Sequence, residues 1–378
     1  MSTALESALL PVYPPPRIGF AEGDGVWLTG TDGVRYLDFA AGIAVVSLGH
    51  RHPAPLAAAH AQLDRLWHAS NLFATDPALA LARILSERFD GARAFFCNSG
   101  TEANEATLKY ARKATGKAGV IALEGSFHGR TLGALAVTGQ PAKRAAFEPL
   151  ADTRFAQPND VASLQAAAGD DVGLILLEPV LGEGGVIPLE PAFAAAAAAL
   201  AEELGALLAF DEVQTGVGRT GTFFAWEQLG VRPQLLTLAK ALANGLPIGC
   251  LLVADDAPDA FAPGDHGSTF GGNPVSCAAA AAVCAAITDE LLTEVRSLGA
   301  RLRDGLATLP GVVEARGAGL LLGAVLDRPA QPVADAALDA GLVCLTAGPD
   351  VLRLAPPLVV GAEEIDLALE ILTEVMTG

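Results

Sequence analysis

The sequence has few positive charges. Among its 378 residues, 24 are lysine or arginine and 43 are aspartate or glutamate, which gives a formal net charge of −19 at pH 7. A surface with this excess of negative charge repels phosphate backbones, so no nucleic-acid partner is expected. An anionic substrate would need positive side chains grouped locally to overcome the general field.

Cysteines are also few, and neither they nor the histidines form the patterns of metal sites. The five cysteines form no C-x-x-C pair, and the six histidines form no H-x-x-x-H pair. No metal ion is therefore expected as a ligand of this chain. Most of the cysteines lie within apolar segments, which is typical of small buried side chains in a reducing compartment.

Long apolar runs and a basic leader are missing as well. No stretch of 18 or more residues is continuously apolar, so no membrane-spanning segment is expected. The first residues, Met1–Glu6, place no basic region before an apolar core, which argues against a secretory signal. We therefore expect a cytoplasmic protein.

Two common motifs of nucleotide-binding proteins and hydrolases, G-x-x-x-x-G-K-[ST] and G-x-S-x-G, do not occur. Segment Gly216–Gly221 does match G-x-G-x-x-G. The aromatic segment Thr222–Trp226 follows it directly in place of a long helix. No acidic residue ends a second strand about 20 residues further on, as a dinucleotide site requires. A nicotinamide cofactor is therefore not favoured.

Apolar segments of strand length alternate with helical segments through the middle of the chain. The expected strands are Arg93–Cys97, Ala118–Leu123, Val172–Leu177, Ala206–Phe210, Leu235–Leu238 and Gly249–Val253. The strongest helical segments are Glu102–Thr115 and Ala192–Leu204. Continuous apolar strands separated by helices predict an α/β fold with a mostly parallel central sheet and helices on both faces.

The length of the chain and the character of its two ends predict two domains. Residues 25–38 form two short segments around Thr31-Asp32-Gly33, which is a hairpin signal. From residue 291 onward a helix, short strands and a final helix follow. We expect residues 46–284 to form a large domain. Residues 1–45 would join a smaller α+β domain formed by residues 285–378.

Two of the expected strands are each followed by a charged residue. Asp211 directly follows Ala206–Phe210, and Lys240 follows Leu235–Leu238 with one residue, Ala239, between them. In open α/β sheets, ligands bind beyond the carboxyl ends of the strands. A lysine in an apolar pocket loses its proton more readily, because desolvation disfavours the ammonium form. A neutral amine can form a Schiff base with a carbonyl, and a facing aspartate would suit a cofactor with a ring cation.

Other polar residues follow other strands. Ser99 and Glu102 fit a capping box at a helix start, and such an end can bind phosphate. An ordinary capped helix is the alternative. After the next strand, Phe127 could stack on a flat ring and Arg130 could bind a carboxylate. A core phenylalanine and a surface arginine would fit these two positions equally well.

Three further candidates come from loops and from the end of the chain. Glu183 lies in a glycine-rich segment, where a solvated loop acid is the alternative. Arg353 lies in an apolar segment and would need a partner if buried, for which Glu183 is a candidate. Ser268 and Thr269 lie in a glycine-rich loop and could bind a phosphate or carboxylate, with a plain turn as the alternative.

Taken together, these segments resemble the class III aminotransferases. The likeness runs from about Tyr13 to the C-terminus, through the ordered segments Ala41–Val45, Asn98–Glu105, Phe127–Thr131, Phe210–Gly216, Leu238–Lys240, Gly267–Pro274 and Arg353–Pro357. The resemblance implies the PLP-dependent transferase fold type I, with pyridoxal 5′-phosphate (PLP) as cofactor in the large domain. It also implies a homodimer with the cofactor site at the subunit interface.

The resemblance also implies roles for individual residues. Lys240 would hold PLP as a Schiff base, and Asp211 would keep the ring nitrogen protonated. The other implied cofactor contacts are Gln214 at the ring hydroxyl, Phe127 and Val213 on the two ring faces, Gly100 and Thr101 at the phosphate, and Thr269 reaching the phosphate across the dimer interface. The implied substrate contacts are Arg130 at the α-carboxylate, Ser268 near the substrate, and Glu183 masking Arg353 until a dicarboxylate enters.

Within the family, the resemblance favours transamination of N2-acetyl-L-ornithine with 2-oxoglutarate, giving N-acetyl-L-glutamate 5-semialdehyde and L-glutamate in arginine biosynthesis. Ile43 stands where the family pattern has a tyrosine in enzymes that act on ornithine. Loss of that hydroxyl would weaken recognition of a free α-amino group and leave room for an acylated one. Succinylornithine, ornithine and 4-aminobutyrate remain open as donors. A non-catalytic PLP-binding regulator is a remote alternative, disfavoured because Lys240, Asp211, Arg130 and Arg353 are all present.

Overall fold

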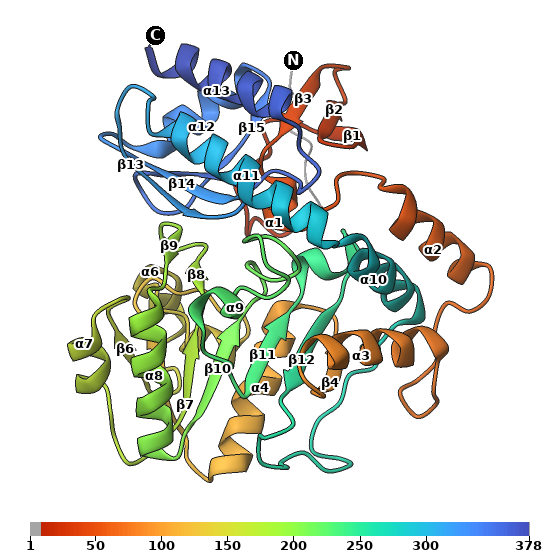
Figure 1. Cartoon of the computed structure of the whole chain (residues 1–378), viewed down its shortest axis with the longest axis vertical. Helices are drawn as coiled ribbons and strands as arrows, with labels where there is room; N and C mark the ends of the chain where they lie inside the picture. Colours follow the sequence, from red (N-terminus) through yellow and green to blue (C-terminus); the bar gives the residue numbers. More distant parts are fainter. Residues whose placement is uncertain (1–8, 378) are drawn as a thin grey trace.

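A seven-stranded sheet lies in the lower half of the computed structural model, which describes residues 9–377 (Figure 1). Its order is β4-β12-β11-β10-β7-β5-β6. The strands are β4 Arg93–Cys97, β5 Gly119–Leu123, β6 Thr153–Ala156, β7 Val172–Leu177, β10 Leu207–Asp211, β11 Leu235–Leu238 and β12 Gly249–Val253. Strand β12 is antiparallel to both neighbours, and the other pairs are parallel. The predicted mostly parallel α/β sheet is confirmed.

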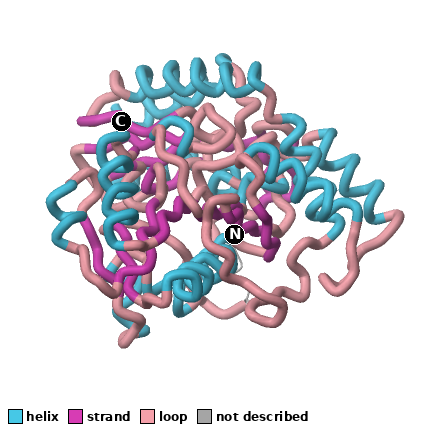
Figure 2. The backbone as a smooth tube through the Cα atoms, turned by 60° about the horizontal axis from the view of Figure 1, so that its bottom comes forward, coloured by secondary structure: helices cyan, strands magenta, loops and turns pink. Residues whose placement is uncertain are grey.

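Helices cover both faces of this sheet. Successive residues of a strand point to opposite faces, so an apolar strand presents apolar side chains to both. In β7, Leu174 and Leu176 belong to the apolar cluster that includes helix α4 (Gly100–Thr115). The alternate residues Ile175 and Leu177 belong to the cluster that includes helix α8 (Pro191–Leu204). Every residue of β7 is buried, which explains its continuous apolar sequence. Figure 2 shows helices on both sides of the strands.

The remaining helices range from 4 to 18 residues in length. They are α1 Ala41–Ala44, α2 Pro53–Leu63, α3 Asp76–Arg88, α5 Leu132–Ala136, α6 Pro141–Arg144, α7 Val161–Ala166, α9 Trp226–Leu229, α10 Pro274–Ala286, α11 Asp289–Leu306, α12 Ala330–Asp339 and α13 Ala362–Thr377, with 3₁₀ turns η1 Ala145–Phe147 and η2 Lys240–Ala243. Among residues 9–377, no helix by itself has the length and apolar character to cross a membrane. Helices α10 and α11 would meet that test only as a pair bent by 74°.

The two helices predicted at Glu102–Thr115 and Ala192–Leu204 begin slightly earlier than the sequence predicts. Helix α4 begins at Gly100 because the Ser99 hydroxyl accepts the backbone N–H of Glu102 at 3.3 Å. Helix α8 begins at Pro191, whose fixed φ suits the first helical position. The short element α1 differs in kind. Its four residues all have positive φ, which makes it a single left-handed turn.

Smaller sheets join the two ends of the described chain. Residues 9–377 contain the four-stranded sheets β1-β2-β3-β15 and β13-β14-β17-β16 and the hairpin β8-β9. Their strands are β1 Phe20–Asp24, β2 Trp27–Gly30, β3 Arg35–Asp38, β8 Val180–Leu181, β9 Ile187–Pro188, β13 Val312–Ala318, β14 Leu321–Leu326, β15 Leu342–Val343, β16 Leu345–Thr346 and β17 Val351–Leu354. Strand β3 pairs in parallel with β15, with Leu37 opposite Leu342. The predicted hairpin is found between β2 and β3. The domain boundaries at residues 45 and 284 remain a prediction.

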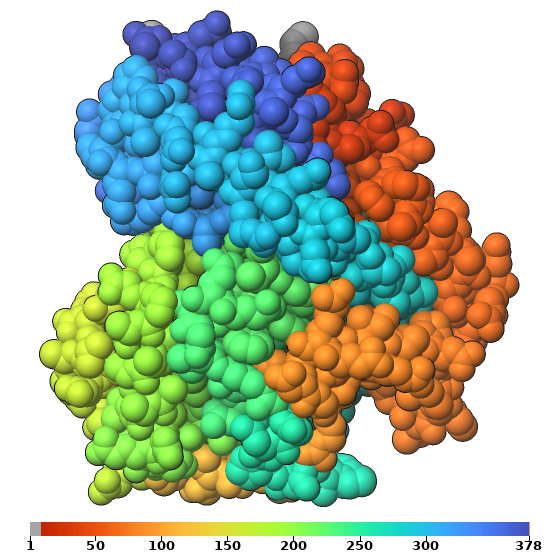
Figure 3. Space-filling view, in the orientation of Figure 1, coloured from red at the N-terminus to blue at the C-terminus, as the bar shows by residue number. Residues whose placement is uncertain are grey.

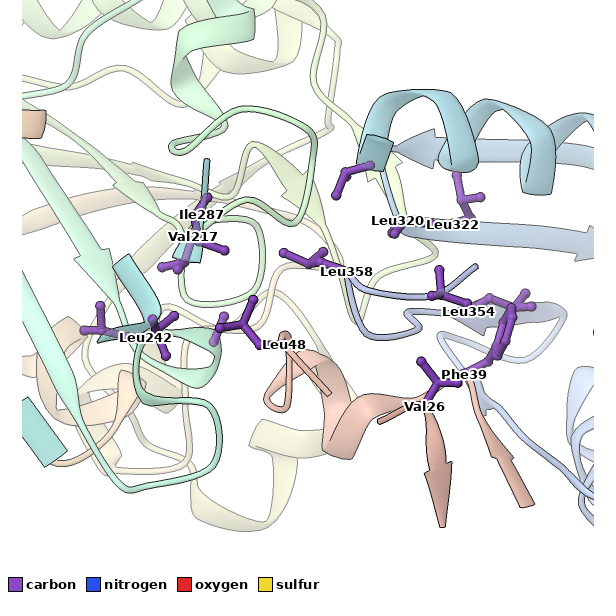
Figure 4. Close-up of a cluster of buried hydrophobic side chains, with 14 of the residues drawn as sticks. Val26, Phe39, Leu48, Val217, Leu242, Ile287, Leu320, Leu322, Leu354 and Leu358 are labelled. Carbon is purple, nitrogen blue, oxygen red and sulfur yellow. The ribbon is translucent and has the colours of Figure 1, made fainter. Parts of the chain in front are cut away.

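One apolar cluster runs from the large sheet into the smaller ones. It contains Leu238 of β11 together with Leu322 of β14 and Leu354 of β17. Figure 4 shows Leu358 of the same cluster between Val217 and Leu354. In the space-filling view of Figure 3, the C-terminal segment in blue packs directly against the N-terminal segment in red. A shared core therefore fixes the smaller sheets relative to the large one.

Candidate active site

A cavity of about 400 Å³ opens at the carboxyl edge of the large sheet. Polar residues reach it from the ends of four strands, namely Ser99 after β4, Glu178 after β7, Asp211 at the end of β10 and Lys240 after β11. These strands run in the same direction, so their carboxyl ends meet at one edge. Segments that are separate in the sequence are thereby brought together.

The Asp211 carboxylate is buried and held by four polar groups. Its Oδ2 accepts a hydrogen bond from Asn104 Nδ2 and lies beside His128 Nδ1, both at 2.7 Å. Its Oδ1 accepts the backbone N–H of Val213 at 3.0 Å and the hydroxyl of Thr237 at 3.3 Å. These partners fix the carboxylate at the cavity wall, where it can face a cation.

Lys240 and Asp211 come from neighbouring parallel strands. In the β10–β11 register, Asp211 lies opposite Thr237, and Thr237 precedes Lys240 by three residues. Asp211 and Lys240 both line the cavity. Burial lowers the pKa of the Lys240 amine to about 8, although the Glu183 carboxylate acts in the opposite direction. With that pKa, about a tenth of the amine is neutral at pH 7. Its φ of 28° is in the left-handed region, which is uncommon for a residue with a side chain.

The amino end of α4 forms another part of the cavity wall, through Ser99, Gly100 and Thr101. A Cβ at Gly100 would lie 2.7 Å from a Val213 methyl group, so this position needs glycine. The hydroxyl of Ser99 also donates to Glu102 at 2.7 Å. A capped helix end carries free N–H groups and a positive dipole, which favour a phosphate. The capped-helix and phosphate-site interpretations are therefore compatible.

Phe127 forms a wall of the cavity, and the buried Glu178 holds its backbone. Glu178 Oε1 accepts the N–H of Phe127 at 2.7 Å, and its Oε2 accepts the N–H of Gly182 at 3.1 Å. Burial raises the pKa of Glu178 to about 7. Arg130 also lines the cavity, where its side chain is exposed and its Cζ lies 5.5 Å from the Phe127 ring centroid.

Arg353 of β17 reaches the loop between β8 and β9. Its Nη1 donates to the Glu183 carboxylate, to the carbonyl oxygen of Gly182 at 2.9 Å and to Gln214 Oε1 at 3.3 Å. Arg353 is only 3% exposed, so its charge needs an anionic partner. That partner is Glu183, the candidate that the sequence suggests. Burial alone would raise the pKa of Glu183, but the Arg353 guanidinium outweighs this effect and keeps the pKa below its ordinary value.

Two predicted site residues, Ser268 and Thr269, are not among the described residues that line the cavity. The Ser268 hydroxyl accepts a hydrogen bond from Asn98 Nδ2 at 3.1 Å, and Asn98 does line the cavity. Thr269 is exposed on the same loop. A single chain therefore does not bring Thr269 to the site. Its contact across a subunit interface remains a prediction.

Sequence reasoning did not assign roles to three residues that shape the site, Asn104, His128 and Glu178. Weak signals for them exist. Asn104 lies one helical turn after Gly100, and residues so spaced share a helix face. His128 directly follows Phe127. Glu178 ends a buried strand in the same way that Asp211 does.

These features fit pyridoxal phosphate. Lys240 provides an amine with a lowered pKa, Asp211 provides a fixed carboxylate, and the start of α4 provides an anion site bordered by Gly100. Together, the fold and the cavity define a PLP-dependent transferase of fold type I.

The chain belongs to the class-III aminotransferase family, whose model matches residues 12–376. It is 47% identical over 377 residues to the acetylornithine aminotransferase of Mycolicibacterium smegmatis, covering 98% of this chain and 96% of that protein. It resembles the solved N-acetylornithine aminotransferase of Stenotrophomonas maltophilia K279a, with 36% identity, a TM-score of 0.83 and 96% of each chain covered. The ornithine aminotransferase of Toxoplasma gondii ME49 aligns with 31% identity and a TM-score of 0.92, covering 98% of this chain and 92% of that one. The predicted family, fold type, cofactor and aminotransferase activity are confirmed.

Proposed function

We propose that this enzyme transfers the δ-amino group of N2-acetyl-L-ornithine to 2-oxoglutarate, giving N-acetyl-L-glutamate 5-semialdehyde and L-glutamate, as a step of arginine biosynthesis. The observation that carries the proposal is the pairing of Arg353 with Glu183 at the cavity of Lys240. The carbon that bears the reacting amine of acetylornithine has no carboxylate, whereas the reacting carbonyl of 2-oxoglutarate has one beside it. A buried arginine that can be covered or uncovered suits both substrates.

We assign the chemistry to the residues at the centre of the cavity. Bound pyridoxal phosphate supplies a ring that takes up the electrons left on a substrate carbon after proton loss. Asp211 keeps the ring nitrogen protonated, which strengthens that effect. Lys240 holds the cofactor at rest, and its free Nζ then takes the proton from the substrate carbon and returns it.

The remaining residues position the cofactor and the substrates. The proposed cofactor contacts are Gln214 at the ring hydroxyl, Phe127 and Val213 at the ring faces, Gly100 and Thr101 at the phosphate, and Thr269 at the same phosphate from a partner subunit. Arg130 binds the α-carboxylate of acetylornithine with its planar fork, and Ser268 lies near the substrate. Glu183 covers Arg353 while the ω-amine is bound and leaves it when the dicarboxylate enters.

We also propose a homodimer with the cofactor site at its interface. Large apolar side chains are exposed on two neighbouring loops, at Trp67, Leu72, Phe73 and Phe270. Asn273 Nδ2 donates to the Trp67 carbonyl at 3.0 Å, which joins these loops. Contiguous apolar surface of this kind marks an interaction site. A second copy that covers this surface would lie next to Thr269, which directly precedes Phe270 in the chain.

We also propose a cytoplasmic location. All five cysteines are free and buried, which supports it.

The test of the proposed activity is a donor panel with 2-oxoglutarate. Acetylornithine, succinylornithine, ornithine and 4-aminobutyrate are compared by the kcat/KM for glutamate formation. We expect acetylornithine to give the highest value. A higher value for any other donor overturns the substrate assignment, while leaving the aminotransferase chemistry intact. Light scattering of the same preparation measures the oligomeric state, and a monomer that is fully active would contradict the dimer.

A further inference from the structure

Lys143 lies close to the active-site wall without an anionic partner. It belongs to the short helix α6, and its Nζ lies 4.7 Å from the centroid of the Phe127 ring. Arg130 Cζ lies 5.5 Å from the same centroid. Within the described part of the chain, the Lys143 ammonium makes neither a salt bridge nor a hydrogen bond. The adjacent Arg144 differs, because it pairs with Glu148 at 3.3 Å.

Lys143 lies among charges of both signs, the carboxylates of Glu183 and Glu178 and the guanidinium groups of Arg130 and Arg353. Its side chain is half-buried, and burial lowers its pKa. The Glu183 carboxylate opposes that shift, while the nearby charges of Arg130 and Arg353 add to it. Glu183 is already bound by Arg353, so Lys143 and Arg130 remain as two cations without a bound carboxylate. A partly buried, unpaired cation is unfavourable, and an entering anion relieves this penalty.

We propose that Lys143 binds the substrate carboxylate remote from the reacting carbon, together with Arg130, so that two cations near the Phe127 ring hold this group, Arg130 from the cavity lining and Lys143 from just outside it. The choice of ligand rests on the proposed function. In acetylornithine the remote group is the α-carboxylate, and in 2-oxoglutarate it is the carboxylate at the far end. The two residues contribute differently, since arginine fixes a carboxylate with a planar fork and lysine follows it as a point charge on a flexible chain.

Two other roles for Lys143 make different predictions. If Lys143 only packs on the Phe127 ring, its charge affects all amines alike, with or without a carboxylate. If Lys143 instead receives Glu183 after that residue leaves Arg353, its loss affects only the half-reaction with the dicarboxylate. The substrate pairs must therefore differ in the remote carboxylate alone.

The experiment compares Lys143→Met, which keeps an apolar stem, with Lys143→Arg, which keeps the charge. The donors are acetylornithine and N-acetylputrescine, which has a hydrogen in place of the α-carboxylate. We expect Lys143→Met to lower kcat/KM for acetylornithine about tenfold, mainly through KM, as for a lost hydrogen bond between charged groups. Its kcat/KM for N-acetylputrescine should stay within about twofold of the wild-type value, and Lys143→Arg should retain most activity with both.

The acceptor side is measured in the same way, with 2-oxoglutarate against 2-oxobutyrate, which has a hydrogen in place of the remote carboxylate. We expect Lys143→Met to lower kcat/KM for 2-oxoglutarate and to leave that for 2-oxobutyrate unchanged. An equal fall for both donors, no fall for either, or a fall for 2-oxoglutarate alone overturns the proposal. If acetylornithine is not the preferred donor, only the proposed function fails. Ornithine and putrescine, or 4-aminobutyrate and propylamine, then provide the matched pair for Lys143.

Discussion

The Arg353 guanidinium is covered by the Glu183 carboxylate, although the two residues are 170 positions apart in the sequence. The same guanidinium nitrogen also donates to the carbonyl oxygen of Gly182 at 2.9 Å. That backbone contact does not depend on the Glu183 side chain. Arg353 can therefore stay in place when the carboxylate leaves, so that uncovering it requires the movement of one side chain.

Glu183→Gln should shift the balance between the two amino donors, acetylornithine and glutamate. The variant removes the negative charge that covers Arg353, so the arginine becomes more available to a carboxylate next to the reacting carbon. We expect the ratio of kcat/KM for acetylornithine to that for glutamate to fall by about tenfold, equivalent to about 1.4 kcal/mol. An unchanged ratio in steady-state assays would leave the covering role without support.

Lys240→Ala should abolish turnover, because it removes both the attachment point of the cofactor and the proton carrier. The absorbance of the cofactor-loaded protein and the rate of glutamate formation are the two measurements. Lys113→Ala is a matched control, since Lys113 makes an exposed ion pair with Asp265 and does not line the cavity. Full activity in Lys240→Ala would refute the mechanism.

The capture of pyridoxal phosphate by cofactor-free protein should depend on pH through Lys240. Its pKa of about 8 means that the neutral, reactive amine increases as the pH rises through that value. We expect the rate to rise about tenfold between pH 6 and 7 and to level off above pH 8, as expected for one titrating amine. The Glu183 carboxylate raises the pKa of Lys240, so Glu183→Gln should move the midpoint to lower pH. A midpoint near 10.5, the ordinary value for lysine, would contradict the structure.

Arg130→Ala should impair both half-reactions, because each substrate has a carboxylate remote from its reacting carbon. The loss should be about 2–4 kcal/mol in kcat/KM, as for a charged pair broken in a partly desolvated site. Arg130→Lys separates charge from fork geometry and should recover only part of this loss. Unchanged specificity constants for acetylornithine and 2-oxoglutarate would remove Arg130 from carboxylate binding.

Gly100→Ala should weaken cofactor binding without unfolding the protein. The new Cβ would lie 2.7 Å from a Val213 methyl group, so either the start of α4 or Val213 must shift. We expect about 1–3 kcal/mol weaker binding of pyridoxal phosphate, as is usual for overpacking. Gly100→Ala should weaken cofactor binding less in a Val213→Ala background than in the wild type, because the Val213 methyl groups are then absent. An equal loss in both backgrounds would show that the contact with Val213 is not the cause.

The sequence predicts that Asp211 and Lys240 lie at one cavity for a physical reason. Asp211 and Lys240 each follow a buried strand, and adjacent parallel strands bring their carboxyl ends together whatever the rest of the fold does. Arg353 and Glu183 are predicted as partners because a buried arginine needs an anion. Both arguments use only burial and charge, and both properties can be read from the sequence pattern.

Other parts of the site depend on tertiary contacts that no local pattern encodes. Asn104 and His128 meet Asp211 only after three separate segments pack together. The left-handed turn at α1 contradicts the intrinsic preference of its residues and is held by the surrounding fold. Lys143 gains its significance from the position of Phe127, which its own sequence neighbourhood does not indicate.

The parallel pairing of β3 with β15 also constrains the order of events during synthesis. Leu37 emerges from the ribosome early, but its partner Leu342 emerges only when the chain is nearly complete. The edge of the N-terminal hairpin thus stays open throughout translation, and open strand edges invite pairing with other chains. A ribosome-bound nascent chain of this enzyme should therefore be most prone to aggregate just before its last strands appear.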